Sequence, residues 1–264
     1  MVALSTANFG LREEIKAYWS DRAENFDDEP GHAIVPGAEE AAWQQLMRRH
    51  LGEGGGRMVL DLASGTGVVS LLLDGLGWRV TGLDWSEPML ERARQKAKAQ
   101  GRNIRFLTAD AERTMEPDQT YDAVVTRHLV WTLVDPVAAF REWHRVLRPG
   151  GRLLLVDGDF VNQSRTARAL AWFSELRQTL RAQGPAELTQ RMRTHRDILS
   201  RVHFADGARA EEIARMLAEA GFIDIRIEKR LWRIHAAQRR SFGLSKWLER
   251  VAQHRYAISA TRPD

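Results

Sequence analysis

The stretch MVLDLASGTGVVSLLL, residues 58–73, decides the fold of this 264-residue chain. An apolar run leads into small residues that include Gly65 and Gly67, and a second apolar run follows at once. Glycine allows the sharp turn by which a buried strand passes into a helix, and the N-terminus of such a helix offers free amide donors. The stretch therefore predicts a strand, a tight loop and a helix. Because a tight turn needs glycine for purely structural reasons as well, the pattern alone leaves the role of the loop open.

Similar segments recur on the C-terminal side of this stretch. Amphipathic segments at 86–101 and 134–151 have helical spacing, with Ser86 expected to cap the first and Gly101 to end it. Parallel strands need such crossover connections, so the alternation predicts an α/β fold with a doubly wound, mostly parallel sheet. The expected strands of its first part are residues 58–63, 78–85, 104–111, 121–128 and 152–159.

The rest of the chain extends this block into what we expect to be a single domain, residues 1–264. Residues 1–51 are expected to form an N-terminal helical lid segment, and residues 161–205 a helical insertion after the fifth strand. Between them, residues 52–160 form the expected ligand-binding core. Residues 206–264 complete the sheet, with a helix at 208–221, strands at 223–232 and 256–262, and a helix at 241–253.

The amino-acid composition limits the kinds of site and partner that the protein can have. The chain has no cysteine, which excludes disulfides, thiolate nucleophiles and cysteine-ligated metals, and we expect no metal site. No apolar run approaches the ~18 residues of a membrane span, and the N-terminus lacks the pattern of a signal peptide, so we expect a cytoplasmic protein without a membrane partner. Residues 1–160 carry 19 basic and 24 acidic residues, and the remainder 20 and 11. The basic C-terminal part allows an anionic partner, but no nucleic-acid motif accompanies it.

Three acids follow three consecutive expected strands. Asp61 precedes the glycine turn, Asp84 ends the second strand and Asp110 lies at the end of the third. An isolated acid at a strand end commonly caps the next helix, whereas a carboxylate in the position of Asp84 can accept hydrogen bonds from both ribose hydroxyls of a nucleoside. Ser70 stands where a dinucleotide site would have its third glycine, and Asp61 would repel a pyrophosphate. The pattern favours a positively charged nucleoside ligand.

These residues resemble the class I S-adenosylmethionine-dependent methyltransferases of the small-molecule, Rossmann-like type. The resemblance covers residues 56–160, where the family's D-x-x-x-G-x-G motif matches Asp61, Gly65 and Gly67, and the turn LRPGG precedes the fifth strand. It implies a seven-stranded sheet whose last strand, filled here by residues 256–262, is antiparallel. It also implies S-adenosylmethionine as cofactor and S-adenosylhomocysteine as product.

The resemblance further implies roles for individual residues. Asp84 would bind the ribose, and Asp110 the adenine, flanked by Trp85 and Met89. The segment AYWSDRAENFD would fold over the cofactor, with Phe26 among its aromatic residues or, equally well, as a core residue. The full set of cofactor residues that we expect is Tyr18, Trp19, Asp61, Ala63, Ser64, Gly65, Gly67, Asp84, Trp85, Met89, Asp110, Ala111 and Arg127.

The implied reaction is methyl transfer to an N or O atom of a small molecule, which can be anionic. His128 and, second, His32 are candidate general bases, although His128 can instead be packed against Trp131 or cap the helix. His195 and His203 lie in the insertion and could reach the substrate, but nothing in the local sequence favours this over a surface position. The candidate substrate residues are Trp131, Arg191, Arg193 and Arg196.

Two other functions stay open. An RNA or protein methyltransferase could use the basic C-terminal half, although TRHLVWTL after the fourth strand lacks the N/D-P-P-Y type of sequence used on base amines. A non-catalytic regulator would bind S-adenosylmethionine without releasing S-adenosylhomocysteine. The sequence does not distinguish a monomer from a homodimer.

Overall fold

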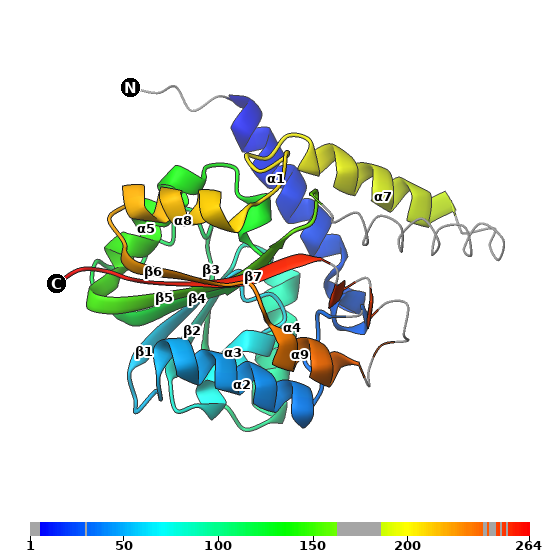
Figure 1. Ribbon diagram of the computed structural model, residues 1–264. Coiled ribbons are helices and arrows are strands. Elements are labelled where there is room, and N and C mark those ends of the chain that lie inside the picture. Colours follow the sequence, from blue (N-terminus) through cyan, green and yellow to red (C-terminus); the bar gives the residue numbers. More distant parts are fainter. Residues whose placement is uncertain are drawn as a thin grey trace.

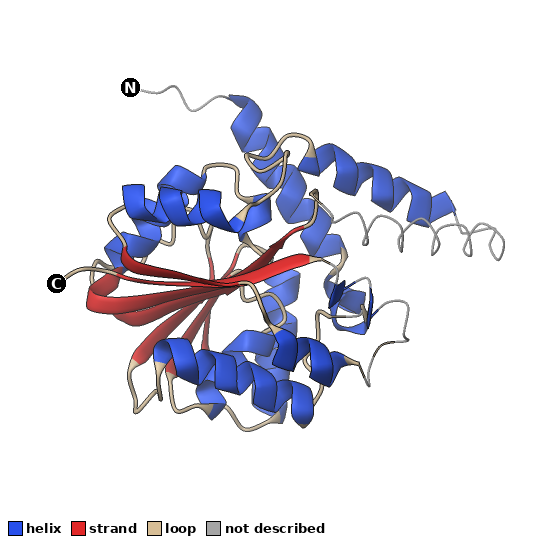
Figure 2. Ribbon diagram, in the orientation of Figure 1, coloured by secondary structure: helices blue, strands red, loops and turns tan. Residues whose placement is uncertain are grey.

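The computed structural model describes residues 6–29, 31–162 and 186–239, residues 242, 247, 248, 250 and 251, and residues 253–264. These residues form a seven-stranded sheet with the order β3-β2-β1-β4-β5-β7-β6 (Figures 1 and 2). The strands are β1 (Met58–Leu62), β2 (Arg79–Asp84), β3 (Arg105–Thr108), β4 (Tyr121–Arg127), β5 (Leu147–Asp159), β6 (Ile223–Glu228) and β7 (His254–Thr261).

The pairing confirms the expected fold class. β1 pairs in parallel with both β2 and β4, β2 with β3, and β4 with β5. β7 runs antiparallel between β5 and β6. In such a sheet the chain leaves β1 for β2 on one side and returns to β4 on the other, which opens a crevice at the carboxyl end of β1.

Helices cover both faces of the sheet (Figure 1). On one face lie α2 (Ala38–Leu51), α3 (Val68–Gly75), α4 (Glu87–Ala99) and α9 (Trp232–Gln238), and on the other α5 (Pro136–Val146) and α8 (Ala210–Glu219). Because side chains alternate along a strand, the buried residues of β5 split between the two cores. Leu153 and Leu155 pack toward Trp143, whereas Leu154 packs toward Trp43.

Two segments far apart in sequence meet beyond the carboxyl edge of the sheet. Helix α1 (Thr6–Asp21) packs on α7 (Ala186–Leu199) through a small apolar cluster that includes Ile15 and Ile198 (Figure 1). The 3-10 helix η1 (Ala23–Asp28) continues from α1. The N-terminal segment is therefore divided, since α2 belongs to the helical layer on the sheet and α1 with η1 lies over its edge. The boundaries of lid and insertion stay predictions.

Local details differ from expectation where pairing or turns intervene. The third strand ends at Thr108, and Asp110 instead forms an isolated bridge with Arg113. The helix expected over 134–151 ends at Val146, because Leu147 already pairs with Tyr121 and begins β5. The strand expected over 223–232 ends at Glu228, and Trp232 begins α9.

Other local expectations are met or fall outside the described residues. The Ser86 hydroxyl accepts a hydrogen bond from the Met89 amide and so caps α4 as expected. The first half of the insertion, residues 163–185, and most of 241–253 lie outside the described residues. In the part of the chain that is described, no helix is both long enough and apolar enough to cross a bilayer.

Candidate active site

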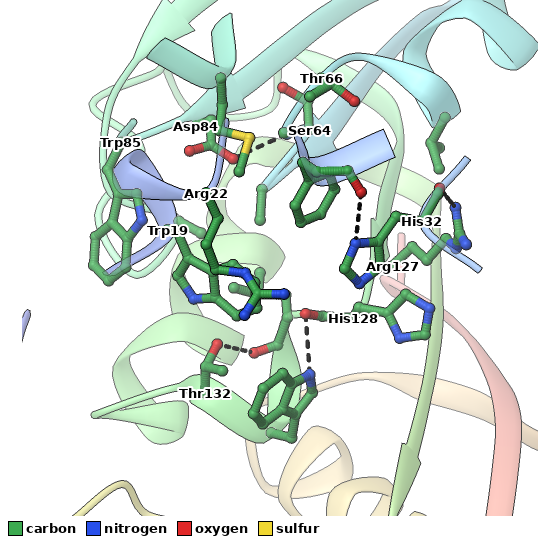
Figure 3. Close-up of a pocket in the computed structure, with 18 of the residues that line it drawn as sticks. Trp19, Arg22, His32, Ser64, Thr66, Asp84, Trp85, Arg127, His128 and Thr132 are labelled. Carbon is green, nitrogen blue, oxygen red and sulfur yellow. Dashed lines mark hydrogen bonds between the residues drawn. The ribbon is translucent and has the colours of Figure 1, made fainter. Parts of the chain in front are cut away.

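A cavity of about 530 Å³ lies at the carboxyl ends of β1, β2 and β4 (Figure 3). Its floor is the sheet edge with the loop after β1, and α1, η1 and α7 contribute its other walls. The volume is within the range of pockets that enclose a cofactor-sized ligand. It is the crevice that the strand order predicts.

The loop after β1 is shaped by left-handed backbone at two glycines. Gly67 has φ 79°, and a Cβ on it would lie 2.9 Å from the Ala93 Cβ of α4, so glycine is needed for helix packing. Gly65 has φ 52°, and a Cβ there would meet only the Phe26 ring, at 3.8 Å. Open space in front of Gly65 therefore belongs to the cavity, and the loop backbone can approach a ligand closely.

Two buried carboxyl groups line the cavity beside this loop. Asp84 accepts hydrogen bonds from the amides of Gly65, at 2.9 Å, and Ser86, at 2.8 Å, and burial raises its pKa to about 6. Asp61 accepts a hydrogen bond from the Ser70 hydroxyl at 2.6 Å, and its pKa rises to about 7, mainly through burial and in part through the nearby charge of Asp84. A cationic ligand would relieve this unfavourable burial.

Ser64 supplies a polar group that the protein itself leaves without a partner. Its hydroxyl oxygen is buried and lines the cavity, and no group among the described residues forms a hydrogen bond with it. Buried polar atoms are nearly always satisfied, so this hydroxyl indicates a ligand or water in the cavity.

The far end of the crevice is flat and mostly apolar. Trp85, the buried Met89 and Ala111 line it together with Asp110. The Asp110 carboxylate accepts a hydrogen bond from the Glu112 amide at 2.9 Å, and burial raises its pKa. Arg12 of α1 forms ion pairs with both acids and thereby fixes α1 at this end.

Aromatic rings form the wall above the loop. Trp19 meets Phe26 edge-on at 6.1 Å between ring centroids and Trp131 at 6.2 Å. His195 of α7 stacks on Tyr18 at 5.6 Å and meets Trp131 edge-on at the same distance. The rings come from α1, η1, α7 and the loop after β4, so the wall exists only where these segments meet.

The candidate base His32 is held by η1. Its Nδ1 lies 2.9 Å from the Phe26 carbonyl oxygen and its ring stacks on Phe26 at 4.1 Å (Figure 3). Burial lowers its pKa, which favours the neutral ring with Nδ1 protonated and donating to that carbonyl. The other nitrogen, Nε2, is then an acceptor.

The candidate base His128 follows β4 in a left-handed conformation, φ 61°. Its carbonyl oxygen accepts a hydrogen bond from the Trp131 indole nitrogen at 3.1 Å, while its ring lies 6.1 Å from that of Phe160. Burial and the nearby Arg127 and Arg255 charges lower its pKa well below the usual value, so the ring is neutral. Non-glycine residues with positive φ are uncommon and concentrate at functional sites.

Arg127 has a structural task in addition to its place in the cavity wall. Its guanidinium donates to the carbonyl oxygens of Gly31 and His32, and it lies 4.7 Å over the Trp43 ring. Arg127 therefore ties the loop before α2 to the end of β4 (Figure 3).

Most of the residues expected from the sequence surround the cavity. Gly67 is absent from its lining because it serves helix packing. Arg193 and Arg196 are exposed on α7 and also absent from the lining, while the side chain of Arg191 lies outside the described residues. His203 is exposed and donates its amide to Leu133 instead of lining the cavity.

Sequence reasoning missed several lining residues, namely Arg22, Phe160, His195, Leu199, Arg250 and Arg255. His195 was noted without an assigned role. Phe160 follows β5, and Arg255 is the second residue of β7. The position of Phe160 after the carboxyl end of a strand was a signal that could have identified it. Arg255 gave no such signal, because it reaches the same edge of the sheet only through the antiparallel direction of β7, which the sheet order reveals.

Comparison with known protein families agrees with this geometry. Residues 60–155 match a family model described as a methyltransferase domain. Demethylmenaquinone methyltransferase of Thermus thermophilus is 43% identical over 103 residues, which is 38% of this chain and 47% of that protein. The ubiquinone/menaquinone biosynthesis C-methyltransferase UbiE of Bdellovibrio bacteriovorus is 32% identical over 153 residues, 57% of this chain and 64% of that protein. The matches thus span about half to two thirds of these relatives.

Solved structures share the fold at low sequence identity. Phosphoethanolamine N-methyltransferase 2 of Haemonchus contortus, in complex with S-adenosylhomocysteine, has a TM-score of 0.65 at 18% identity, covering 96% of this chain and 60% of that one. Geranyl diphosphate C-methyltransferase of Streptomyces coelicolor, also bound to S-adenosylhomocysteine, has a TM-score of 0.60 at 16% identity, covering 96% and 98%.

Proposed function

We propose that this chain is a class I S-adenosylmethionine-dependent methyltransferase, which its match to a methyltransferase domain over residues 60–155 supports, and that it transfers a methyl group from S-adenosylmethionine to a small, ring-containing acceptor. The observation that carries the proposal is a single cavity with two different sides. One side is the loop with two buried acids, and the other is a wall of aromatic rings and histidines. When bound, the cofactor supplies a methyl group activated by its positively charged sulfur.

The residues present fit that cofactor. The unpartnered Ser64 hydroxyl and the open space before Gly65 leave room and polar contacts for it. A carboxylate has about four acceptor sites, and Asp84 interacts with the amides of Gly65, Ser86 and Trp85, so a lone pair remains for the ribose hydroxyls. Asp61 would orient the methionine part, and Trp85 with Met89 would enclose the adenine.

The buried acids favour this cofactor over an anionic dinucleotide. Two carboxyl groups with raised pKa values would repel a pyrophosphate and attract a ligand that carries a sulfonium and an ammonium. Aromatic faces near a sulfonium add to the attraction, because the ring quadrupole draws cations. Trp19 and Phe26 are the rings available over the loop.

For the acceptor atom, the relatives point to carbon. The sequence indicated an N or O atom, whereas the two curated relatives above are named as a demethylmenaquinone methyltransferase and a C-methyltransferase of quinone biosynthesis. An aromatic wall suits a flat ring, and Trp131 with Phe160, whose ring centroids are 5.6 Å apart, offers one. We therefore favour a ring carbon of a hydroxylated aromatic acceptor over nitrogen or oxygen.

This chain's own residues would position the acceptor and exclude water. The rings of α1, η1 and α7 close over the cavity, and holding the acceptor in line with the methyl group supplies much of the rate in a displacement of this kind. Methylation of a ring carbon breaks the bond from sulfur to the methyl group and displaces the proton on that carbon. This proton moves to the ring oxygen if the acceptor reacts as a hydroxylate, and if the acceptor arrives protonated, neutral His128 or the Nε2 of His32 can accept the proton that is released.

Calorimetry and product analysis test the proposal. S-adenosylhomocysteine should bind wild-type protein, and Asp84→Asn should weaken binding by about tenfold, the loss of a charge-assisted hydrogen bond. Glu53→Gln, at an exposed acid distant from the cavity, is the matched control. Incubation with dihydroxynaphthalenes and a methyl-labelled cofactor should release S-adenosylhomocysteine and put the label on ring carbon by NMR. Binding without release for rings, amines, RNA and peptides alike would instead make the protein a regulator.

A further inference from the structure

Three arginines from separate elements line one part of the cavity. Arg127 ends β4, Arg250 precedes β7 and Arg255 lies within it. Burial, together with the mutual repulsion of the three charges, lowers the pKa of Arg255 to about 9 and that of Arg127 to about 10. Grouping three cations in one buried wall is unfavourable unless something negative joins them.

Two of the three are engaged with the protein. Arg127 donates to two carbonyl oxygens of the loop before α2. The Arg250 guanidinium lies against Gly31, and its Nε donates to Gln238 at 3.4 Å. These contacts hold both side chains in place.

Arg255 is held less fully, since among the described residues only its Nε has a hydrogen-bond partner. Its Nε donates to the Gln253 side chain at 3.1 Å, and no Asp or Glu in the described part of the chain forms an ion pair with it. The guanidinium lies 5.6 Å over the Phe160 ring, and Phe160 in turn meets Trp131. The two Nη groups form no hydrogen bond with a described residue, while the side chain lines the cavity.

The nearby acids are occupied elsewhere. Asp157 attracts Arg255, but its two oxygens accept the amides of Val130 and Gly158, at 2.7 and 2.8 Å, and burial raises its pKa to about 7. Glu39, which attracts Arg127 and Arg250, accepts a hydrogen bond from Gln238 at 2.7 Å. Asp157 therefore balances the charge of Arg255 only in part.

We propose that Arg255 binds a negatively charged oxygen of the methyl acceptor, whose ring packs against Phe160 and Trp131. This inference rests on the proposed function for the identity of the pocket. Arg127 and Arg250 strengthen the contact by their charge, and Arg255 can form the fork of two hydrogen bonds that an oxyanion favours. The oxyanion has two possible sources, an acidic substituent of the acceptor or an ionised hydroxyl on its ring.

The contact between Arg255 and an oxyanion can be tested by binding alone, with a charged probe and a neutral probe of the same shape. With S-adenosylhomocysteine bound, 1-naphthoate should bind wild-type protein about tenfold tighter than the neutral isostere 1-naphthamide. Arg255→Gln should remove the difference, and Arg255→Lys should restore part of it. Arg141→Gln, at an exposed arginine of α5, should leave it unchanged. The affinity for S-adenosylhomocysteine, measured by calorimetry, tests the proposed function independently. It should be the same in wild-type protein and in the three variants.

A second probe distinguishes the two sources. 4-Nitrophenol changes its absorption spectrum when it ionises, so its pKa can be read in the bound state. If the ligand is a ring hydroxylate, bound 4-nitrophenol should ionise about one pH unit lower in wild-type protein than in Arg255→Gln. A naphthoate preference without this change assigns the oxyanion to an acidic substituent. Equal binding of naphthoate and naphthamide to wild-type protein, together with a pKa of bound nitrophenol equal to that of free nitrophenol, would overturn the proposal, and both measurements need only wild-type protein.

Discussion

The Thr66 hydroxyl of the glycine loop donates a hydrogen bond to the Asp27 carboxylate of η1 at 2.7 Å. Asp27 also forms an ion pair with Lys96 of α4. A single carboxylate thus joins the segment over the cavity to the two elements on its floor. Phe26 holds η1 on the cavity side through its contacts with Trp19 and His32, and Ala23 is the buried residue of this helix.

Removing this carboxylate should loosen the segment over the cofactor site. We expect Asp27→Ala to raise the dissociation constant of S-adenosylhomocysteine about five- to tenfold, mostly through faster dissociation, because the loss of a charge-assisted hydrogen bond is worth about 1–1.5 kcal/mol. The Tm should change little, since η1 lies outside the main cores. Stopped-flow dissociation measures the effect. Asp28→Ala, at the exposed neighbour, is the control, and equal dissociation rates in the two variants would count against a closing role for η1.

The two glycines of the loop should respond differently to alanine. In Gly67→Ala the new methyl group would lie 2.9 Å from the Ala93 Cβ at a φ of 79°, so we expect a loss of about 2–4 kcal/mol in the free energy of unfolding. In Gly65→Ala only backbone strain of about 1 kcal/mol opposes folding, but the methyl group enters the cavity. Urea unfolding and S-adenosylhomocysteine calorimetry should therefore rank the variants in opposite orders.

The parts of the site that sequence predicts well are those built by local chemistry. The turn at Gly65 and Gly67 and the acids Asp61 and Asp84 follow from the order strand, loop, helix, and parallel strands bring their carboxyl ends to one edge. Ser86 as a helix cap is equally local. Such features depend on residues a few positions apart, which a single sequence contains in full.

The parts that sequence predicts poorly depend on contacts between distant segments. His195 reaches the cavity only because α7 packs on α1, and Arg255 only because β7 inserts antiparallel between β5 and β6. Arg193 and Arg196 belong to the basic C-terminal part that allows an anionic partner, but the helix places both at the surface. Net charge of a segment does not say which face of a helix carries it.

Cofactor binding should release protons near neutral pH. Asp61 and Asp84 have pKa values raised to about 7 and about 6, and a sulfonium nearby favours their charged forms. The affinity for S-adenosylmethionine should therefore fall as the pH drops from 8 to about 5.5, and more steeply than the affinity for S-adenosylhomocysteine. Titration calorimetry in two buffers of different ionisation enthalpy measures the protons released, and a value of zero at pH 6.5 would contradict this coupling.

The same shift affects the stability of the ligand-free protein. Because folding raises the pKa of Asp61, the stability linked to this group is present at pH values below about 4 and is lost as the pH rises through about 7. Asp61→Asn, which keeps an acceptor for the Ser70 hydroxyl, should raise the free energy of unfolding at pH 8 by about 1–3 kcal/mol and have little effect at pH 4. It should also weaken cofactor binding. A variant destabilised at pH 8 would show that burial of this charge is already compensated in the protein.

His128 offers the sharpest test of proton transfer, because its backbone permits a conservative change. Asparagine tolerates the left-handed φ of 61° better than most residues do, so His128→Asn removes the imidazole with little strain. If this imidazole accepts the proton of the acceptor, kcat should fall about 100-fold or more while S-adenosylhomocysteine binds as before. Since its pKa lies well below the usual value, the wild-type kcat should show no inflection from this group near pH 6.5.

His203→Asn, at an exposed histidine outside the cavity, is the control. An unchanged kcat in His128→Asn would transfer the role to His32, whose ring on Phe26 is the other neutral imidazole that the sequence nominated.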